Sequence, residues 1–342
     1  MLNLVLSSLR KVVADPDVAI DLGTANTRLY AHGKGIIADI PSAVKVNREK
    51  GSVEAVGKSA LPSAKNNSSA DSILPLRAGV IKDIEGATYL LTPLLHKVRR
   101  FGLIKPRVLA CAPTDATPEE REALVEATLR AGAAAVKVAP EPLAAAIGVG
   151  LDISSPYAQM LVDIGDGVTD IAVIRDSTLI STAATRIACS DLHRAIQDML
   201  LAHHNLCLSL SEAERLAQTI GVLPTSKTAS IQQVLATSSI TNEKLTAQIN
   251  TEEISQAMSP IINKIITTIC GVIRDLPPMT SCEVIESGIS LTGGGACLPG
   301  MPALIAAKTS LDIRPVANPM HAVINGACQM LSCKMTSGFW LT

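Results

Sequence analysis

The chain has few aromatic residues. One Trp, three Tyr and two Phe account for 2% of its 342 residues, and the only Trp, Trp340, stands near the C-terminus. So few rings leave no platform on which the bases of a single-stranded nucleic acid would stack. We therefore expect a core built from Ala, Leu, Ile and Val.

The chain also lacks an excess of charge of either sign. It has 30 basic and 31 acidic residues, for a net charge of −1. Nucleic-acid binding depends on a basic surface that neutralises phosphates, so we expect no nucleic-acid partner. A composition of 18% charged and 47% hydrophobic residues is typical of a globular chain. At roughly 150 residues per domain, this length predicts two domains.

None of the eight cysteines forms a Cys-x-x-Cys pair, which disfavours zinc ribbons and redox motifs. Several stand inside apolar runs, such as Cys111 at the end of Val108-Leu109-Ala110. We expect them to be buried free thiols of a reducing compartment.

No apolar run reaches the ~20 residues that a membrane-spanning helix needs. The N-terminus nevertheless has an amphipathic pattern, because Leu2, Leu6 and Leu9 share one face of a helix that ends near Arg10 and Lys11. Such a helix can lie on an anionic membrane surface. A helix packed on the domain, or a tail, explains the same pattern, and both alternatives stay open.

One sequence element occurs twice. Residues 20–27 and 162–169 both read apolar-Asp-apolar-Gly-x-x-x-Thr. Glycine lets backbone amides close on phosphate oxygens, and threonine hydroxyls add donors. An aspartate at the end of a strand can hold Mg²⁺ through waters. Two copies in register indicate an internal duplication of a phosphate-binding hairpin, and a third glycine-rich turn stands at 292–296.

The rest of the chain alternates between strand and helix patterns, which predicts an α/β fold. Thr117 is expected to cap a helix with Pro118 at its first position. Strands are expected at 18–22, 28–31, 107–112, 135–139, 160–164, 170–174 and 288–291. Helices are expected at 87–100, 143–150, 190–204, 210–220, 251–275, 300–308 and 320–334.

These motifs resemble the actin, Hsp70 and sugar-kinase superfamily, and within it the bacterial actin family MreB. The resemblance covers nearly the whole chain and includes 20–27, 79–83, 113–117, 141–150, 203–206, 213–216 and 291–296. It implies an actin-like bilobed ATPase fold of two ribonuclease-H-like domains. Lobe I would comprise 1–144 and 316–342 with a subdomain IB inserted at about 33–77. Lobe II would comprise 145–315 with a subdomain IIB inserted at about 184–245.

The resemblance also implies a function. A protein of this family would bind ATP with Mg²⁺ and form cytoskeletal filaments on the inner face of the cell membrane. It would organise cell-wall synthesis and rod shape. Its partners would be other copies of itself, the membrane surface, and membrane proteins of cell shape and wall synthesis. It would be cytoplasmic and peripheral on the membrane.

Site residues follow from the resemblance by position. Asp21 and Asp163 would stand near Mg²⁺, and Glu141 would orient the attacking water beside Thr169. Glu214 would approach the ribose, and Ala217 stands where the family has a lysine that contacts adenosine. Leu103 and Ile104 would join Leu2, Leu6 and Leu9 in contacting the membrane. The remaining nucleotide contacts would come from Gly23, Thr24, Ala25 and Asn26, from Gly165, Asp166, Gly167 and Val168, and from Gly293, Gly294, Gly295 and Ala296.

The chain departs from the family pattern in its second loop. Asp166 replaces a glycine and would bring a carboxylate toward phosphates. Val168 replaces a threonine and removes a hydroxyl that would help to position water. We therefore hypothesise weak ATP binding and impaired hydrolysis, which leaves open whether the chain is an enzyme.

Two alternatives accompany this hypothesis. One is a non-polymerising adaptor or regulator with a degraded nucleotide site. The other is a small-molecule kinase of the same superfamily, which would need an aspartate as general base. Asp115 and Asp170 are the nearest candidates, and neither stands in a sugar-binding context.

Overall fold

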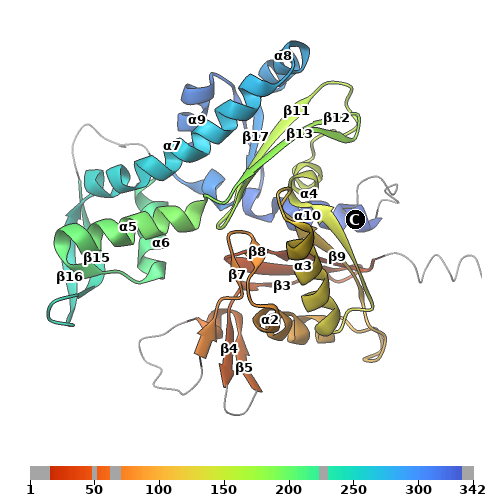
Figure 1. Cartoon of the computed structure of the whole chain (residues 1–342), viewed down its shortest axis with the longest axis horizontal. Coiled ribbons are helices and arrows are strands. Elements are labelled where there is room, and N and C mark those ends of the chain that lie inside the picture. The colour runs from red at the N-terminus through yellow and green to blue at the C-terminus, as the bar shows by residue number, and fades with distance from the viewer. Residues whose placement is uncertain (1–15, 48–51, 62–70, 223–229, 333–342) are drawn as a thin grey trace, which may run out of the picture. The chain divides into compact units, whose positions relative to one another are not determined.

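The computed structural model describes residues 16–47, 52–61, 71–222 and 230–332. Leu2, Leu6 and Leu9 lie outside these ranges, so their expected membrane helix stays a prediction. The chain divides into two compact units (Figure 1). Unit 1 holds the residues up to Gly150 and those from Ala322 onward, and unit 2 holds Leu151–His321.

Unit 1 is built on a sheet with the strand order β10-β9-β1-β2-β3. Strand β1 is buried along its whole length, because it lies at the centre with β2 antiparallel on one side and β9 parallel on the other. The hairpin expected after β1 is confirmed, although β2 begins two residues earlier than 28. The strands are β1 (Val18–Leu22), β2 (Asn26–Ala31), β3 (Gly35–Pro41), β9 (Arg107–Ala112) and β10 (Ala135–Pro140).

In the described part of unit 1, four α-helices pack with this sheet. The cap expected at Thr117 is confirmed, because its side chain accepts from the Glu120 amide and the Glu120 carboxylate accepts from the Thr117 amide. One helix begins at Ile84 rather than 87, because the Asp83 side chain caps it by accepting from the Gly86 amide. The helices are α2 (Ile84–Lys97), α3 (Pro118–Arg130), α4 (Glu141–Gly148) and α10 (Ala322–Ser332).

Short strands follow β3 in the segment where an inserted subdomain was expected. One sheet has the order β5-β4-β6, and β7 pairs with β8. The elements are β4 (Val44–Asn47), β5 (Ser52–Val56), the 3-10 helix η1 (Gly57–Ala60), β6 (Asp71–Ile73), β7 (Leu76–Arg77) and β8 (Val80–Ile81).

Unit 2 repeats the topology of unit 1. Its main sheet has the order β13-β12-β11-β17-β18, in which β11 pairs antiparallel with β12 and parallel with β17. The central strand β11 therefore corresponds to β1, and the duplicated motif belongs to a duplicated sheet. The strands are β11 (Gln159–Ile164), β12 (Thr169–Arg175), β13 (Thr178–Thr185), β17 (Ile289–Thr292) and β18 (Ile313–Arg314).

The remaining elements of unit 2 include a small sheet with the order β14-β15-β16. Among the described residues, α7 is long and apolar enough to pass a membrane-span test, but its apolar stripe lies in the core of unit 2. The elements are α5 (Cys189–His204), β14 (Leu206–Cys207), α6 (Leu210–Ile220), β15 (Ile231–Ser238), β16 (Lys244–Asn250), α7 (Thr251–Asp275), α8 (Pro278–Ser287), the 3-10 helices η2 (Gly294–Cys297) and η3 (Pro319–His321), and α9 (Met301–Thr309).

The expectation of buried cysteines is only partly right. Cys111 and Cys189 are buried free thiols, whereas Cys207, Cys282 and Cys297 are exposed. Cys207 stands on the two-residue edge strand β14, Cys282 on α8 and Cys297 at the end of η2. A side chain is covered on all sides only inside a central strand or on the inner face of a helix, so these three thiols stay exposed.

Candidate functional site

The first phosphate-loop hairpin is closed by its own backbone. Between β1 and β2, the Gly23 amide donates to the Asn26 carbonyl over 3.1 Å. Thr24 anchors this loop elsewhere in unit 1, because its hydroxyl oxygen accepts from the Gly79 amide over 2.9 Å. The Ala25 carbonyl accepts from the Ser42 amide. The loop is thus held before any ligand arrives.

The second hairpin repeats this closure. Between β11 and β12, the Gly165 amide donates to the Val168 carbonyl over 2.9 Å. The first turn of α5 then holds the loop, because the Ser190 amide donates to the Asp166 carbonyl. Val168 is buried, and the Thr169 hydroxyl donates to the Ile187 carbonyl over 2.8 Å. We expected Thr169 at the reaction centre. In the structure, its hydroxyl group makes a hydrogen bond that fixes the loop.

The two aspartates of the repeat face different neighbours across their hairpins. Asp21 stands opposite Arg28, and the Arg28 guanidinium lies 3.1 Å from the Asp21 carboxylate and 3.2 Å from that of Asp39. Asp163 stands opposite Asp170, another carboxyl group. A pair of carboxylates attracts a divalent cation, whereas an arginine next to a carboxylate repels it. Asp163, which is paired with Asp170, is therefore a better place for Mg²⁺ than Asp21, which is paired with Arg28.

Glu141 is placed with Asp21 inside unit 1. It is the first residue of α4 and is buried directly after β10. Burial, followed by the charges of Asp21 and Glu141, raises the pKa of the Cys111 thiol well above its ordinary range. Asp21 and Glu141 therefore both lie near the Cys111 thiol at the carboxyl ends of β1, β9 and β10, where α/β sheets place their ligand-binding groups.

Asp166 lies in an acidic surrounding within unit 2. Burial, followed by the charges of Glu214 and Asp191, raises the pKa of Asp166 to about 6. Its Oδ1 atom lies 4.0 Å from Nδ1 of His193 on α5. Burial lowers the pKa of His193 to about 4, so the imidazole is neutral at pH 7. The Asp166 carboxyl group is thus directed toward α5.

The third glycine-rich turn packs on the second loop. A Cβ atom at Gly293 or Gly295 would collide with Ile164, whereas one at Gly294 would meet nothing within 4 Å. The adjoining Ala296 packs against the core of unit 2. On α6, Glu214 is exposed and Ala217 is buried. Unit 2 therefore brings together the second loop, the third turn and Glu214.

The expected membrane loop is strongly exposed, and it contains one residue that the sequence analysis missed. Leu103 is 84% exposed and Ile104 is 57% exposed, and Phe101 is 85% exposed beside them. The loop turns on positive φ angles at Phe101 and Gly102. The sequence signal for this exposed aromatic residue was the Phe101-Gly102 pair, which follows two arginines.

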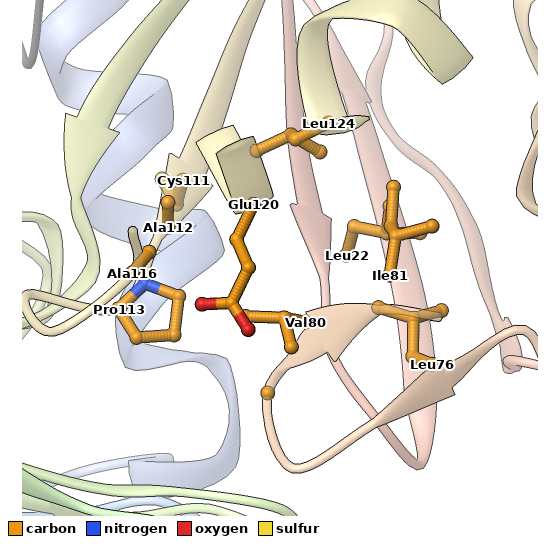
Figure 2. Close-up of a pocket in the computed structure, with 11 residues that line it drawn as sticks. Leu22, Leu76, Val80, Ile81, Cys111, Ala112, Pro113, Ala116, Glu120 and Leu124 are labelled. Atoms are coloured by element: carbon orange, nitrogen blue, oxygen red, sulfur yellow. The ribbon is translucent and has the colours of Figure 1, made fainter. Parts of the chain in front are cut away.

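A small apolar pocket lies beside the first loop in unit 1 (Figure 2). Glu120 of α3 reaches into it, and its carboxylate accepts from the Lys82 ammonium over 3.1 Å. The pocket separates β1 from the β7–β8 turn that anchors Thr24, so it belongs to the support of the first loop. Its walls are Leu22, Leu76, Gly79, Val80, Ile81, Cys111, Ala112, Pro113, Ala116, Glu120 and Leu124.

Replacing Asp166 with asparagine is expected to stabilise the fold at neutral pH. Because folding raises the pKa of Asp166 from 3.8 to about 6, its ionised form destabilises the folded state. This penalty is absent below about pH 4 and nearly complete at pH 7, so Asp166→Asn gains about 3 kcal/mol at neutral pH and nothing below pH 4. Chemical denaturation of both proteins at the two pH values measures the difference. An equal gain at both would contradict the burial of a carboxylate.

Comparisons with known proteins agree with this geometry. The family described as MreB/Mbl protein matches residues 15–337. The cell shape-determining protein Mbl of Bacillus cereus is 34% identical over 92% of this chain and 95% of its own. MreB of Escherichia coli is 32% identical over 92% of this chain and 93% of its own.

Solved structures show the same fold. MreB5 of Spiroplasma citri bound to AMPPNP is 27% identical and superposes with a TM-score of 0.83, covering 92% of this chain and 95% of that one. A chain of the MamK double helical filament is 21% identical with a TM-score of 0.75, covering 92% of this chain and 98% of that one, which shows the fold alone. The resemblance and the actin-like α/β fold expected from the motifs are therefore confirmed. The chain belongs to the MreB/Mbl family of actin-like, cell shape-determining proteins.

Proposed function

We propose that this protein is an ATP-binding cytoskeletal protein that assembles into filaments with copies of itself. It acts on the inner face of the cell membrane, where it organises wall synthesis and rod shape together with membrane proteins of that process. Binding of ATP and Mg²⁺ is the first step of this function.

The repeated, self-closed hairpin carries this proposal. Each unit ends its central strand with an aspartate and a glycine whose amide closes the turn, and each loop is tied to a neighbouring element. Backbone held in this way presents amides to phosphate at little cost in conformational entropy. Asp163 with Asp170 supplies the carboxylates that Mg²⁺ prefers.

The relatives support the same function. The solved MreB5 structures were obtained with AMPPNP and with ADP, and the MamK structure is of a double helical filament. The curated relatives carry the name cell shape-determining protein. The ligand to test first is therefore an adenine nucleotide, and the partner to test first is a second copy of this chain.

The first experiment measures ATP affinity and phosphate release. The purified chain is compared with an Asp166→Gly, Val168→Thr double variant, which restores the family pattern. Our hypothesis expects weak binding and slow release in the natural chain, and stronger binding in the variant. Tight binding and clear turnover in the natural chain would instead give an ordinary ATPase of the family. No binding by either protein would overturn the proposed nucleotide function.

Sedimentation separates the filament from an adaptor. We expect the protein to pellet at high speed with ATP and Mg²⁺, and to pellet less without them. A protein that stays in the supernatant under every condition would favour a non-polymerising adaptor with the same fold.

Replacing Leu103 and Ile104 together with glutamate is expected to abolish binding to anionic vesicles. Both side chains are exposed near Arg100 and Lys105, an arrangement that suits a membrane interface. Burying each side chain in the acyl region contributes about 1.5–3 kcal/mol. Vesicle flotation measures the loss.

Leu235→Glu is the matched control for this variant. Leu235 is 65% exposed on β15 of unit 2, away from the loop in sequence. It should leave vesicle binding unchanged. Equal binding by the double variant and the natural chain would show that this loop does not contact the membrane.

A further inference from the structure

The second hairpin loop carries a carboxyl group that the first loop lacks. In the aligned repeats, Asp166 stands where the first loop has Thr24. The Asp166 carbonyl accepts from the Ser190 amide at the start of α5 over 2.9 Å, so the loop cannot move this residue away without breaking that bond. The Asp166 side chain is 25% exposed, which leaves it open to exchange protons with solvent. A titratable group is thus fixed in the loop that we propose for phosphate.

The neighbours of Asp166 come from two helices, the end of a strand and the third turn. Oδ1 of Asp166 lies 4.0 Å from Nδ1 of His193. The charges that act on Asp166 are those of Glu214 and Asp191. The titratable or charged groups around Asp166 and the adjoining Cys189 thiol are Glu214 on α6, Asp191, His193, Arg194 and Cys189 on α5, Asp163 on β11, and Cys297 at the end of η2.

This cluster offers Asp166 little compensating positive charge. Arg194 lies 3.5 Å from the Asp191 carboxylate and offsets part of that charge. The Glu214 carboxylate accepts from the neutral amide of Gln218. Carboxylates therefore outweigh cations here, and any further negative group that enters the loop is repelled.

The charge of Asp166 changes near neutral pH, whereas the charges of its neutral neighbours do not. Burial and the two neighbouring carboxylates raise the pKa of Asp166 to about 6. Burial lowers the pKa of His193 to about 4 and raises the pKa of the Cys189 and Cys297 thiols above its ordinary value. These three side chains are therefore neutral between pH 5 and pH 8, while the loop gains a negative charge as the pH rises through 6.

A phosphate in the loop and an ionised Asp166 oppose each other. The ionised carboxylate weakens phosphate binding, and a bound phosphate in turn favours the protonated carboxyl group. A protonated carboxyl group also has an O–H donor that an ionised one lacks. Binding of phosphate and uptake of a proton are therefore linked.

We propose that protonation of Asp166 controls nucleotide binding, so that the nucleotide and one proton bind together. This inference rests on the proposed function, because it needs a phosphate at the second loop. It adds a regulation of that site: the chain binds nucleotide best in mildly acidic solution, and its affinity falls as the pH rises above neutral.

The affinity for ATP with Mg²⁺, measured by titration calorimetry from pH 5.5 to pH 8, tests this linkage. The affinity of the natural chain relative to that of Asp166→Asn should fall about tenfold or more over this range. Titration of the nucleotide itself is common to both proteins and cancels in the ratio. In buffers of different ionisation enthalpy, the natural chain should take up about one proton more than the variant at pH 7.5. Asp166→Ser repeats the comparison if Asp166→Asn fails to fold.

Asp191→Asn tests the cluster without changing the loop. An asparagine oxygen can still accept from the Ala188 amide, so the first turn of α5 keeps its contact. Loss of this charge should move the fall in affinity to higher pH-independent binding strength and its midpoint to lower pH, since Asp166 then ionises more easily. Asp198→Asn is the matched control, because Asp198 is exposed about two turns further along α5 and should leave the midpoint unchanged.

The outcomes separate this inference from the proposed function. A ratio of affinities that stays constant with pH, while both proteins bind, would overturn the proton linkage and leave nucleotide binding standing. No binding by either protein at any pH would overturn the proposed function and this inference with it.

Discussion

Replacing Gly293 with alanine is expected to weaken nucleotide binding strongly, whereas the same change at Gly271 in α7 should leave it intact. Gly293 has a φ of +81°, which an alanine adopts only with strain. Its Cβ would lie 2.2 Å from the Ile164 carbonyl oxygen and 2.5 Å from Oδ1 of Asp163. Backbone at the end of a central strand does not move aside cheaply, so the second loop and the third turn must separate.

The expected loss is about 100-fold in affinity, which corresponds to about 3 kcal/mol. Separation of the two segments moves Asp163, the carboxylate favoured for Mg²⁺, together with the backbone that leads into Gly165. Titration with a fluorescent ATP analogue measures the affinity, and circular dichroism shows that the variant is folded.

Gly271→Ala is the matched control for this change. Gly271 lies in α7, outside the expected nucleotide contacts, and it has open space around its Cβ position and no positive φ. This variant should bind nucleotide as the natural chain does. Equal affinity of the Gly293 variant would show that the third turn does not support the phosphate loop.

The duplicated motif was the part of the site that the sequence could predict well. An aspartate after an apolar run and a glycine at the turn are local features, because strand ends and tight turns depend on neighbouring residues. The hairpins at 20–27 and 162–169 therefore appeared where they were expected, each closed by its glycine amide.

Contacts between distant segments could not be predicted in this way. Nothing local distinguishes the partner of Asp21, which is Arg28, from that of Asp163, which is Asp170, until the strand register is known. The direction of the Asp166 carboxyl group toward His193 likewise depends on how α5 packs. The hypothesis of repulsion at Asp166 was drawn from its position in the loop and did not include this neighbour.

The packing of α4 on α10 is a second long-range feature, and it predicts a large loss of stability. A Cβ at Gly326 would lie 1.7 Å from the Ala144 carbonyl oxygen, and one at Gly148 would lie 1.9 Å from that of Ala322. Each helix therefore offers a glycine to the backbone of the other. Gly326→Ala forces the helices apart, at a cost of about 3 kcal/mol or more.

We expect the midpoint of thermal unfolding of Gly326→Ala to fall by about 10 °C, given about 2–4 °C per kcal/mol in a unit of this size.

Gly271→Ala makes the same change inside α7, where nothing lies within 4 Å of the Cβ position. It should instead gain up to about 1 kcal/mol, because alanine favours a helix over glycine. Because the same substitution would change the stability in opposite directions at the two sites, the pair separates the effect of the helix contact from that of helix propensity. Since α4 begins at Glu141, separation of the helices should also slow any phosphate release. Equal midpoints for Gly326→Ala and the natural chain would show that α4 and α10 do not meet backbone to backbone.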